Sequence, residues 1–246
     1  MKGIINYTLI IFLALLSSCQ PENQRCFKSN GVLSEEIILL DSFNEIVVED
    51  FVYVELKQDT VYKIVLSGGK NLLPFIKYEL NDGKLFLNDE NSCRWLRQND
   101  APLITVSFPD IDKLTITNSG VITCSNTINL DNFSVENRAG LCDINIRVNC
   151  DSIWFRTHAG TGDFVLSGEA DYSYIYNIGS GHMRAQALIN NTTHIVHRST
   201  GDITINVSSL LMVEDLQHGI LYYYGCPEMI VAAEHLQQNM HNMGYY

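Results

Sequence analysis

Turn-like tripeptides that end in glycine recur in this chain at intervals of 20, 20, 21, 20 and 18 residues. The six glycines are Gly120, Gly140, Gly160, Gly181, Gly201 and Gly219. Glycine is favoured where a turn needs positive φ, or where two backbones approach closely. A fixed interval is typical of a repeat protein whose units stack on one another. We therefore predict a structural turn at each glycine, one for every coil.

Apolar and polar side chains alternate after each glycine. The second, fourth and sixth positions are mostly apolar or small, as in Cys142, Ile144 and Ile146, and polar residues such as Asp143 and Asn145 lie between them. These two sets face opposite sides of a strand. A second short strand precedes each glycine, so the pattern predicts an all-β fold, a parallel β-solenoid with about 20 residues per coil. An antiparallel sandwich also uses short strands, but it does not predict glycine at a fixed phase.

The repeat and its flanks give the expected domain organisation. We expect a signal peptide at 1–18, a tether and lead-in at 19–39, and one β-solenoid domain at 40–246. Within that domain we expect irregular N-terminal coils at 40–109, regular coils at 110–225, and a C-terminal cap at 226–246. The cap is compatible with an amphipathic helix or with a final pair of strands.

Local signals add detail to the irregular coils. The triplet Asn81-Asp82-Gly83 predicts a hairpin turn. Pro109 ends a strand predicted at Leu103–Phe108, and a short turn or helix is expected at Leu72–Ile76.

The N-terminus carries an export signal. An apolar stretch from Ile4 to Leu16 follows Lys2, and it is shorter than the roughly 20 residues that a spanning helix needs. The sequence Leu16-Ser17-Ser18-Cys19 resembles a bacterial lipobox, which predicts lipidation of Cys19 with palmitate among the acyl chains. An ordinary signal peptide that happens to contain a cysteine is the alternative. We expect a lipid-anchored envelope protein, in the outer membrane, facing the periplasm or the cell surface.

Charge and cysteine content exclude several classes of partner. The chain has 16 Lys and Arg against 28 Asp and Glu, a formal net charge of −12, which argues against nucleic acid. Six cysteines besides Cys19 show no CxxC pattern of a metal or redox site, and their disulfide state is left open: Cys26, Cys93, Cys124, Cys142, Cys150 and Cys226. No cofactor is expected.

Four segments together resemble a known family. Leu40–Val48 is similar to its opening strand, and Ile104–Leu114 to its central joint of strand, proline, acidic residue and leucine. Turns of the Gly201–Ile203 type are similar to its glycine ladder, and Tyr223–Pro227 to its late Tyr-x-Gly-x-Pro signature. The family is DUF2807, the auto-transporter adhesin head GIN domain, many of whose members are lipoproteins of Bacteroidota.

The resemblance covers Leu40 to Ala232 and implies a β-solenoid and a role in adhesion. It favours strand over helix in the segment that follows Pro227. The chain departs from the family at Glu49–Phe51, where a glycine-serine-glycine turn is usual, and this puts the geometry of the first coil in question. No ligand-binding residue carries over from the family.

Candidate catalytic and metal sites have weak support. Asp143 and Asp163 share the third position of neighbouring coils, where two carboxylates could act on a glycosidic bond, but turn residues that cap backbone amides are the better interpretation. The histidines near the corners differ in phase and are expected at the surface, with no metal site: His158, His182, His197 and His218. A disulfide between Cys124 and Cys142 is a minor alternative to two small buried hydrophobes.

A set of tyrosines is the best candidate for a binding surface. Outward-facing tyrosines on a flat parallel sheet form a platform for sugar or protein, and the candidates are Tyr172, Tyr174, Tyr176, Tyr222 and Tyr224. Ordinary packing of half of the tyrosines is the alternative. We expect a non-catalytic, adhesin-like envelope lipoprotein that binds protein or polysaccharide. A polysaccharide lyase or hydrolase on a β-helix scaffold is the alternative function.

Overall fold

The computed structural model describes residues 29–91, 101–138 and 140–246. The predicted signal peptide, the predicted lipidation site Cys19, and the cysteines Cys26 and Cys93 lie outside these residues. Helix in the described part is confined to η2 (Leu73–Phe75) and α2 (Glu234–Gln237). No helix in these ranges is long and apolar enough to cross a membrane.

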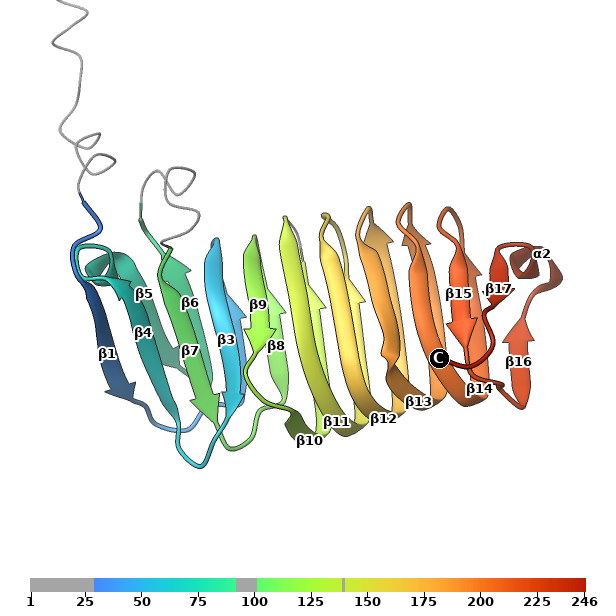
Figure 1. Ribbon diagram of the computed structural model, residues 1–246, viewed down its shortest axis with the longest axis horizontal. Coiled ribbons are helices and arrows are strands. Elements are labelled where there is room, and N and C mark those ends of the chain that lie inside the picture. The colour runs from blue at the N-terminus through green and yellow to red at the C-terminus, as the bar shows by residue number, and fades with distance from the viewer. Residues whose placement is uncertain (1–28, 92–100, 139) are drawn as a thin grey trace, which may run out of the picture.

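Four long strands form the regular part of a β-solenoid. They are β11 (Cys142–Thr157), β12 (Asp163–Gly179), β13 (His182–Ser199) and β14 (Ile203–Leu216). Each pairs in parallel with the next, and Ile144 aligns with Phe164 in the following coil. The strands lie side by side along the long axis (Figure 1). The predicted fold class is confirmed, with about six turns about 20 residues apart.

The long strand β11 bends near its middle, which gives the coil two walls. In β11 the buried residues are even-numbered from Cys142 to Val148 and odd-numbered from Ile153 to Thr157. The change occurs at Asp151 and Ser152, where neither side chain is buried. We call the wall that follows each glycine corner the first wall, and the wall that precedes the next glycine corner the second wall.

Short strands continue both walls at the C-terminal end. β15 (Leu221–Tyr224) and β17 (Met240–Asn242) extend the first wall, and β16 (Met229–Ala232) extends the second wall. The segment after Pro227 is therefore a pair of strands joined through the single turn α2, as the family resemblance implied. The amphipathic helix is not formed.

The coil that precedes β11 stacks on a distant part of the chain. Its strands are β8 (Lys113–Ile116), β9 (Gly120–Cys124) and β10 (Ile128–Asn137). β8 pairs in parallel with β2 (Glu45–Val48), and β9 pairs in parallel with β3 (Val52–Gln58). This coil of β2 and β3 is in regular register despite Glu49–Phe51, so the departure from the family turn leaves its stacking intact.

The chain between β3 and β8 folds back to the other side of this first coil. The strands involved are β4 (Lys63–Gly69), β5 (Ile76–Asn81), β6 (Lys84–Asp89) and β7 (Leu103–Phe108). β6 pairs in parallel with β2 and β7 with β3, whereas β5 is antiparallel to β6 and β4 to β7. β1 (Leu33–Leu39) is antiparallel to β4. The predicted hairpin is present, since β5 and β6 pair from Asn81 opposite Lys84. Its two turn residues, Asp82 and Gly83, have positive φ values of 48° and 72°.

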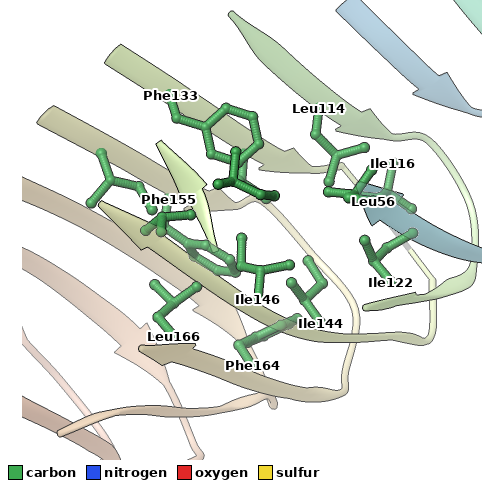
Figure 2. Packing of buried hydrophobic residues seen from close by; sticks show 14 of the residues in the cluster. Leu56, Leu114, Ile116, Ile122, Phe133, Ile144, Ile146, Phe155, Phe164 and Leu166 are labelled. Carbon is green, nitrogen blue, oxygen red and sulfur yellow. The ribbon is translucent and has the colours of Figure 1, made fainter. Parts of the chain in front are cut away.

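One hydrophobic core runs through the whole stack. Leu56 of β3, Leu114 of β8 and Phe133 of β10 are all fully buried and belong to the same cluster. Figure 2 shows these side chains and those of the next coils pointing into the space between the walls. Phe155 and Phe164 lie in adjacent coils with ring centroids 5.3 Å apart. Burial of a side chain of this size contributes roughly 1.5–3 kcal/mol relative to its exposure.

The glycines form two columns instead of the single ladder that the sequence interval predicts. One column contains Gly120, Cys142, Gly162, Gly181, Gly201 and Gly219. The other lies two residues earlier and contains Asn118, Gly140, Gly160 and Gly179. The predicted ladder was therefore wrong in register, because it joined members of both columns. The interval of about 20 residues does not distinguish the two columns, because each corner can carry glycine at either of two positions that are two residues apart.

Close backbone approach is the reason for glycine at these corners. A Cβ atom on Gly160 would overlap the carbonyl oxygen of Gly140, and a Cβ atom on Gly219 would overlap that of Gly201. Gly160 also has a φ of +101°, which disfavours any side chain. The two-residue shift keeps the parity of the strand, so the predicted inward and outward sets still hold.

Candidate functional site

Aromatic side chains gather on the outer surface of the second wall. Tyr172, Tyr174 and Tyr176 of β12 are partly exposed and alternate with the buried residues Ser173 and Ile175. All three tyrosines therefore face outward. The alternative of ordinary packing does not apply to this strand.

The sequence interpretation missed three further members of this group. Trp154 aligns with Tyr174 in the next coil, and its ring centroid lies 6.4 Å from that of Tyr172. His194 packs edge-on against Tyr174 at 5.1 Å, and His158 lies 5.5 Å from Tyr176. We call these six residues the aromatic face: Trp154, His158, Tyr172, Tyr174, Tyr176 and His194. Residues 154, 174 and 194 are 20 apart, so the interval itself could have identified them.

The structure divides the predicted platform in two. Tyr222 and Tyr224 lie on β15 in the first wall, where they align with Thr204 and Asn206. Tyr222 stacks on His241 at 5.6 Å, and Tyr224 contacts the ring of Tyr246 at 5.3 Å. These two tyrosines belong to the C-terminal end of the first wall and do not extend the aromatic face.

Charged residues adjoin the aromatic face on the N-terminal side of the second wall. Oε2 of Glu45 lies 2.7 Å from Nζ of Lys84, and Oε1 of Glu45 lies 3.9 Å from Nζ of Lys113. Burial alone would raise the pKa of Glu45, but hydrogen bonds from Lys84 and Thr115 and the charge of Lys113 outweigh it and lower the pKa. A carboxylate held in this way stays ionised at neutral pH.

Glu136 is the second carboxylate of this region. Its Oε2 contacts Lys113 at 2.6 Å, and its Oε1 contacts Arg138 and His158, each at 3.3 Å. Burial tends to raise the pKa of Glu136, and the hydrogen bond and charge of Lys113, with those of Arg138, lower it overall. His158 thereby connects the ion pairs to the aromatic face.

The corner between the two walls is acidic. Asp131, Asp151 and Asp171 occupy successive coils there and line a groove of about 510 Å³, with Asn191 in the next coil. Asn191 donates a hydrogen bond of 2.8 Å to Asp171. Negative charge is thus concentrated along this corner, next to Tyr172 but on the opposite side of it from Tyr174.

Of the two carboxylates considered for catalysis, one caps a backbone amide and the other forms an ion pair. Oδ1 of Asp143 accepts a hydrogen bond of 2.9 Å from the backbone N–H of Asp163 in the next coil. Asp163 in turn contacts Arg184 at 3.2 Å. Further along the same column, Asp202 accepts a hydrogen bond from the backbone N–H of Ile220. These bonds fit the interpretation of turn residues and do not favour a lyase or hydrolase.

One histidine prediction was wrong. His158, His182 and His218 are exposed, but His197 is completely buried. Its Nε2 donates to the carbonyl oxygen of Gly201 at 2.8 Å, so its Nδ1 is the acceptor for Nδ2 of Asn177 at 3.4 Å. Burial lowers the pKa of His197, because the charged ring would lose its hydration. Within the described ranges no group of three or more histidine, cysteine or acidic side chains is placed to hold a metal.

The described cysteines are free thiols. Cys142 is buried, and the residue aligned with it in the preceding coil is Gly120 and not Cys124. None of the four described cysteines, Cys124, Cys142, Cys150 and Cys226, forms a disulfide. Burial, with the charge of Asp143, raises the pKa of Cys142 to about 12. A thiol with such a pKa stays protonated at neutral pH and behaves as a small hydrophobe.

The fold and its outer surfaces define a rigid, two-walled β-solenoid with an aromatic patch on one wall. The family profile described as "Putative auto-transporter adhesin, head GIN domain" matches residues 42–227. The chain therefore belongs to the DUF2807 family, as the sequence resemblance indicated. No curated protein matches it.

Solved structures share this fold at low sequence identity. An adhesin candidate ("putative adhesin") from Bacteroides fragilis superposes with a TM-score of 0.71 and 20% identity, over 87% of this chain and 94% of that one. A "putative lipid binding protein" from Parabacteroides distasonis gives 0.55 and 17%, over 87% and 95%. A "putative adhesin" from Parabacteroides merdae gives 0.55 and 12%, over 88% and 95%. At these identities the likeness shows the fold alone.

Proposed function

We propose that this chain is a non-catalytic envelope lipoprotein that binds polysaccharide on its aromatic face. The observation that carries the proposal is the outward stacking of Trp154, Tyr172, Tyr174 and Tyr176 on one wall. Indole and phenol rings combine broad apolar surface with a polar edge, which suits the mixed surface of a sugar ring. The rings come from adjacent coils, so their spacing follows the strand spacing of about 4.8 Å and is held by the core.

The sequence supports the envelope location. The apolar stretch ahead of Leu16-Ser17-Ser18-Cys19 is the basis for a cleaved signal and lipidation of Cys19, with palmitate in the anchor. A dual acyl anchor binds a membrane stably. The family description and the names of two structural neighbours, each a "putative adhesin", agree with a protein of the cell surface or envelope. We place it in the outer membrane.

A rigid scaffold favours binding over catalysis in this proposal. At the glycine corners Asp143 and Asp202 are bonded to backbone amides and Asp163 is paired with Arg184, and the six residues of the aromatic face include no acid. The histidines of the face are engaged, because His194 contacts Glu214 at 3.0 Å and His158 contacts Glu136. The face therefore offers contact surface and fixed charge.

The test is binding to arrayed glycans and extracted surface polysaccharides by the full chain in detergent micelles. We expect Trp154→Ala and Tyr174→Ala each to weaken binding about tenfold, as truncation of a central aromatic contact does. Tyr222→Ala is the matched control, because Tyr222 is a partly exposed tyrosine on the other wall. The proposal fails if no glycan binds above an unrelated acidic lipoprotein, or if the control is equally damaging.

A further inference from the structure

Basic side chains gather on the N-terminal part of the second wall, in a chain whose net charge is −12. We define the basic patch by four cations that surround the two carboxylates Glu45 and Glu136. The cations are Lys84, Lys113, Arg138 and Arg156. The patch therefore has a positive balance, while the acidic corner of Asp131, Asp151 and Asp171 lies across the tyrosines from it.

Arg156 is the member of the patch without a carboxylate partner. It aligns with Glu136 of the preceding coil, but Glu136 already contacts Lys113, Arg138 and His158. Among the residues that the structure describes, no carboxylate oxygen lies within 4.0 Å of a guanidinium nitrogen of Arg156, so Arg156 forms no ion pair with them. Its guanidinium carbon lies 5.9 Å from the ring centroid of Tyr174. An Arg positioned over an aromatic ring keeps its N–H groups available for an anion in the plane of the guanidinium.

The position of Arg156 joins the two halves of this wall. Trp154 and Tyr174 lie on one side of it, and the ion pairs around Glu136 lie on the other. A ligand whose ring rests on Trp154 or Tyr174 would therefore bring its substituents within reach of the guanidinium. A guanidinium binds a carboxylate through two parallel hydrogen bonds, and such charge-assisted bonds are about twice as strong as neutral ones.

We propose that the polysaccharide bound by the aromatic face is acidic, and that Arg156 pairs with its carboxylate groups. This inference rests on the proposed function, and it adds the chemical class of the ligand. The acidic corner gives the ligand an orientation, because its carboxylates are repelled from Asp171 and attracted toward Arg156. Neutral polysaccharides would use the rings alone and bind more weakly.

The experiment compares one polymer in two charge states. Polygalacturonate and its methyl ester have the same backbone, but esterification removes the negative charge. Binding of each to the full chain in detergent micelles is measured by biolayer interferometry at low and at high salt. We expect polygalacturonate to bind at least about tenfold more tightly at low salt, and this advantage to shrink at high salt, because salt screens exposed charges.

Two substitutions assign the effect to one side chain. Arg156→Gln is expected to weaken the binding of polygalacturonate about tenfold and to leave the ester unchanged. Arg147→Gln is the matched control, since Arg147 is an exposed arginine of the same strand β11, in the first wall. Arg147→Gln should change the affinity for neither polymer. Trp154→Ala should weaken the binding of both polymers.

The outcomes separate this inference from the proposed function. Equal binding of the acid and the ester, or loss of acid binding in both arginine variants, overturns the inference while leaving polysaccharide binding in place. A sulfated glucan that binds tightly while polygalacturonate does not would also overturn it, because the anion would then be sulfate. If neither polymer nor any arrayed glycan binds, the proposed function fails together with it.

Discussion

The N-terminal region (β1 to β7) and the regular coils (β8 to β15) use the same stacking, but they reach it by different chain paths. In the regular coils each residue stacks on one about 20 positions away, as Ile144 does on Phe164. In the N-terminal region Val48 stacks on Ile116 and Leu56 on Cys124, which are 68 positions away. The walls continue through both regions without a break in pairing.

This difference shows that a solenoid coil need not be continuous in sequence. β6 and β7 occupy the place of a coil ahead of β2 and β3, although they follow them in the chain. The antiparallel strands β1, β4 and β5 then complete that end. Periodicity is visible only where neighbours in space are also neighbours in sequence.

The largest expected effect comes from the glycine columns, which only the regular coils possess. Gly160→Ala should destabilise the protein by about 3–5 kcal/mol, because the new Cβ collides with the carbonyl of Gly140 and φ is positive. Gly83→Ala, in the N-terminal hairpin, has positive φ but only Oδ1 of Asn44 nearby, at 3.2 Å. It should cost about 1 kcal/mol.

Urea unfolding followed by circular dichroism measures both variants. Gly244→Ala is a control for positive φ alone, since no atom lies within 4 Å of its added Cβ. Equal losses at Gly160 and Gly83 would show that backbone collision adds nothing to the cost of positive φ.

The second prediction concerns cooperativity between the two regions. Phe108 in β7 and Phe155 in β11 are both fully buried in one continuous core. Each Phe→Ala change should destabilise the protein by about 3–5 kcal/mol and shift one shared unfolding transition. Calorimetry should show a single peak in both variants. Two separate peaks in Phe108→Ala would mean that the N-terminal region unfolds as an independent unit.

The smallest effect is a difference in acid sensitivity. The pKa of His197 in the regular coils is lowered by burial, so the unfolded chain takes up the proton first. The stability that neutral His197 contributes is complete above its ordinary pKa of 6.5 and is lost as the pH falls below it. Protonation would also place Nδ1–H against the Asn177 amide, which is a donor.

Glu45 in the N-terminal region responds in a lower range. Its folded pKa is below the ordinary 4.5, so its contribution is present above 4.5 and is lost as the pH falls through the lower folded value. Urea midpoints measured from pH 7.5 to 3.5 should therefore decline in two stages. His197→Gln should remove the first stage, and Glu45→Gln should reduce the second stage, to which Glu136 also contributes. A first stage that persists in His197→Gln would assign it to another group.

Sequence reasoning established the regular coils because alternation and interval agree there. It placed Ile144, Ile146 and Asp143 on their observed sides, but it left open which of the tyrosines face outward. It could not find the pairing of β2 with β8, because no local signal reports a partner 68 residues away. It also mistook the glycine register by two residues and placed His197 at the surface, since a buried histidine needs acceptors and donors that only the packed coils supply.

The candidate site shows the same limit. The sequence named Tyr172, Tyr174 and Tyr176 as candidates, but their shared outward side and their separation from Tyr222 and Tyr224 depend on where each coil bends. The basic patch extends from Lys84 on β6 to Arg156 on β11, over five neighbouring strands, and its charge balance depends on which cations Glu136 engages. Contacts of that kind are properties of the assembled wall.

The buried polar column of the second wall has a consequence for how the chain finds its register. Near-identical coils could slip past one another by a whole repeat and still bury apolar side chains. Asn137, Thr157, Asn177 and His197 stack in that order between Ile116 and Leu216. Thr157 donates to Asn177 at 2.6 Å, and Asn177 reaches His197. A slip by one repeat would separate Thr157 from Asn177 and Asn177 from His197, so these buried hydrogen bonds favour the native register of the coils.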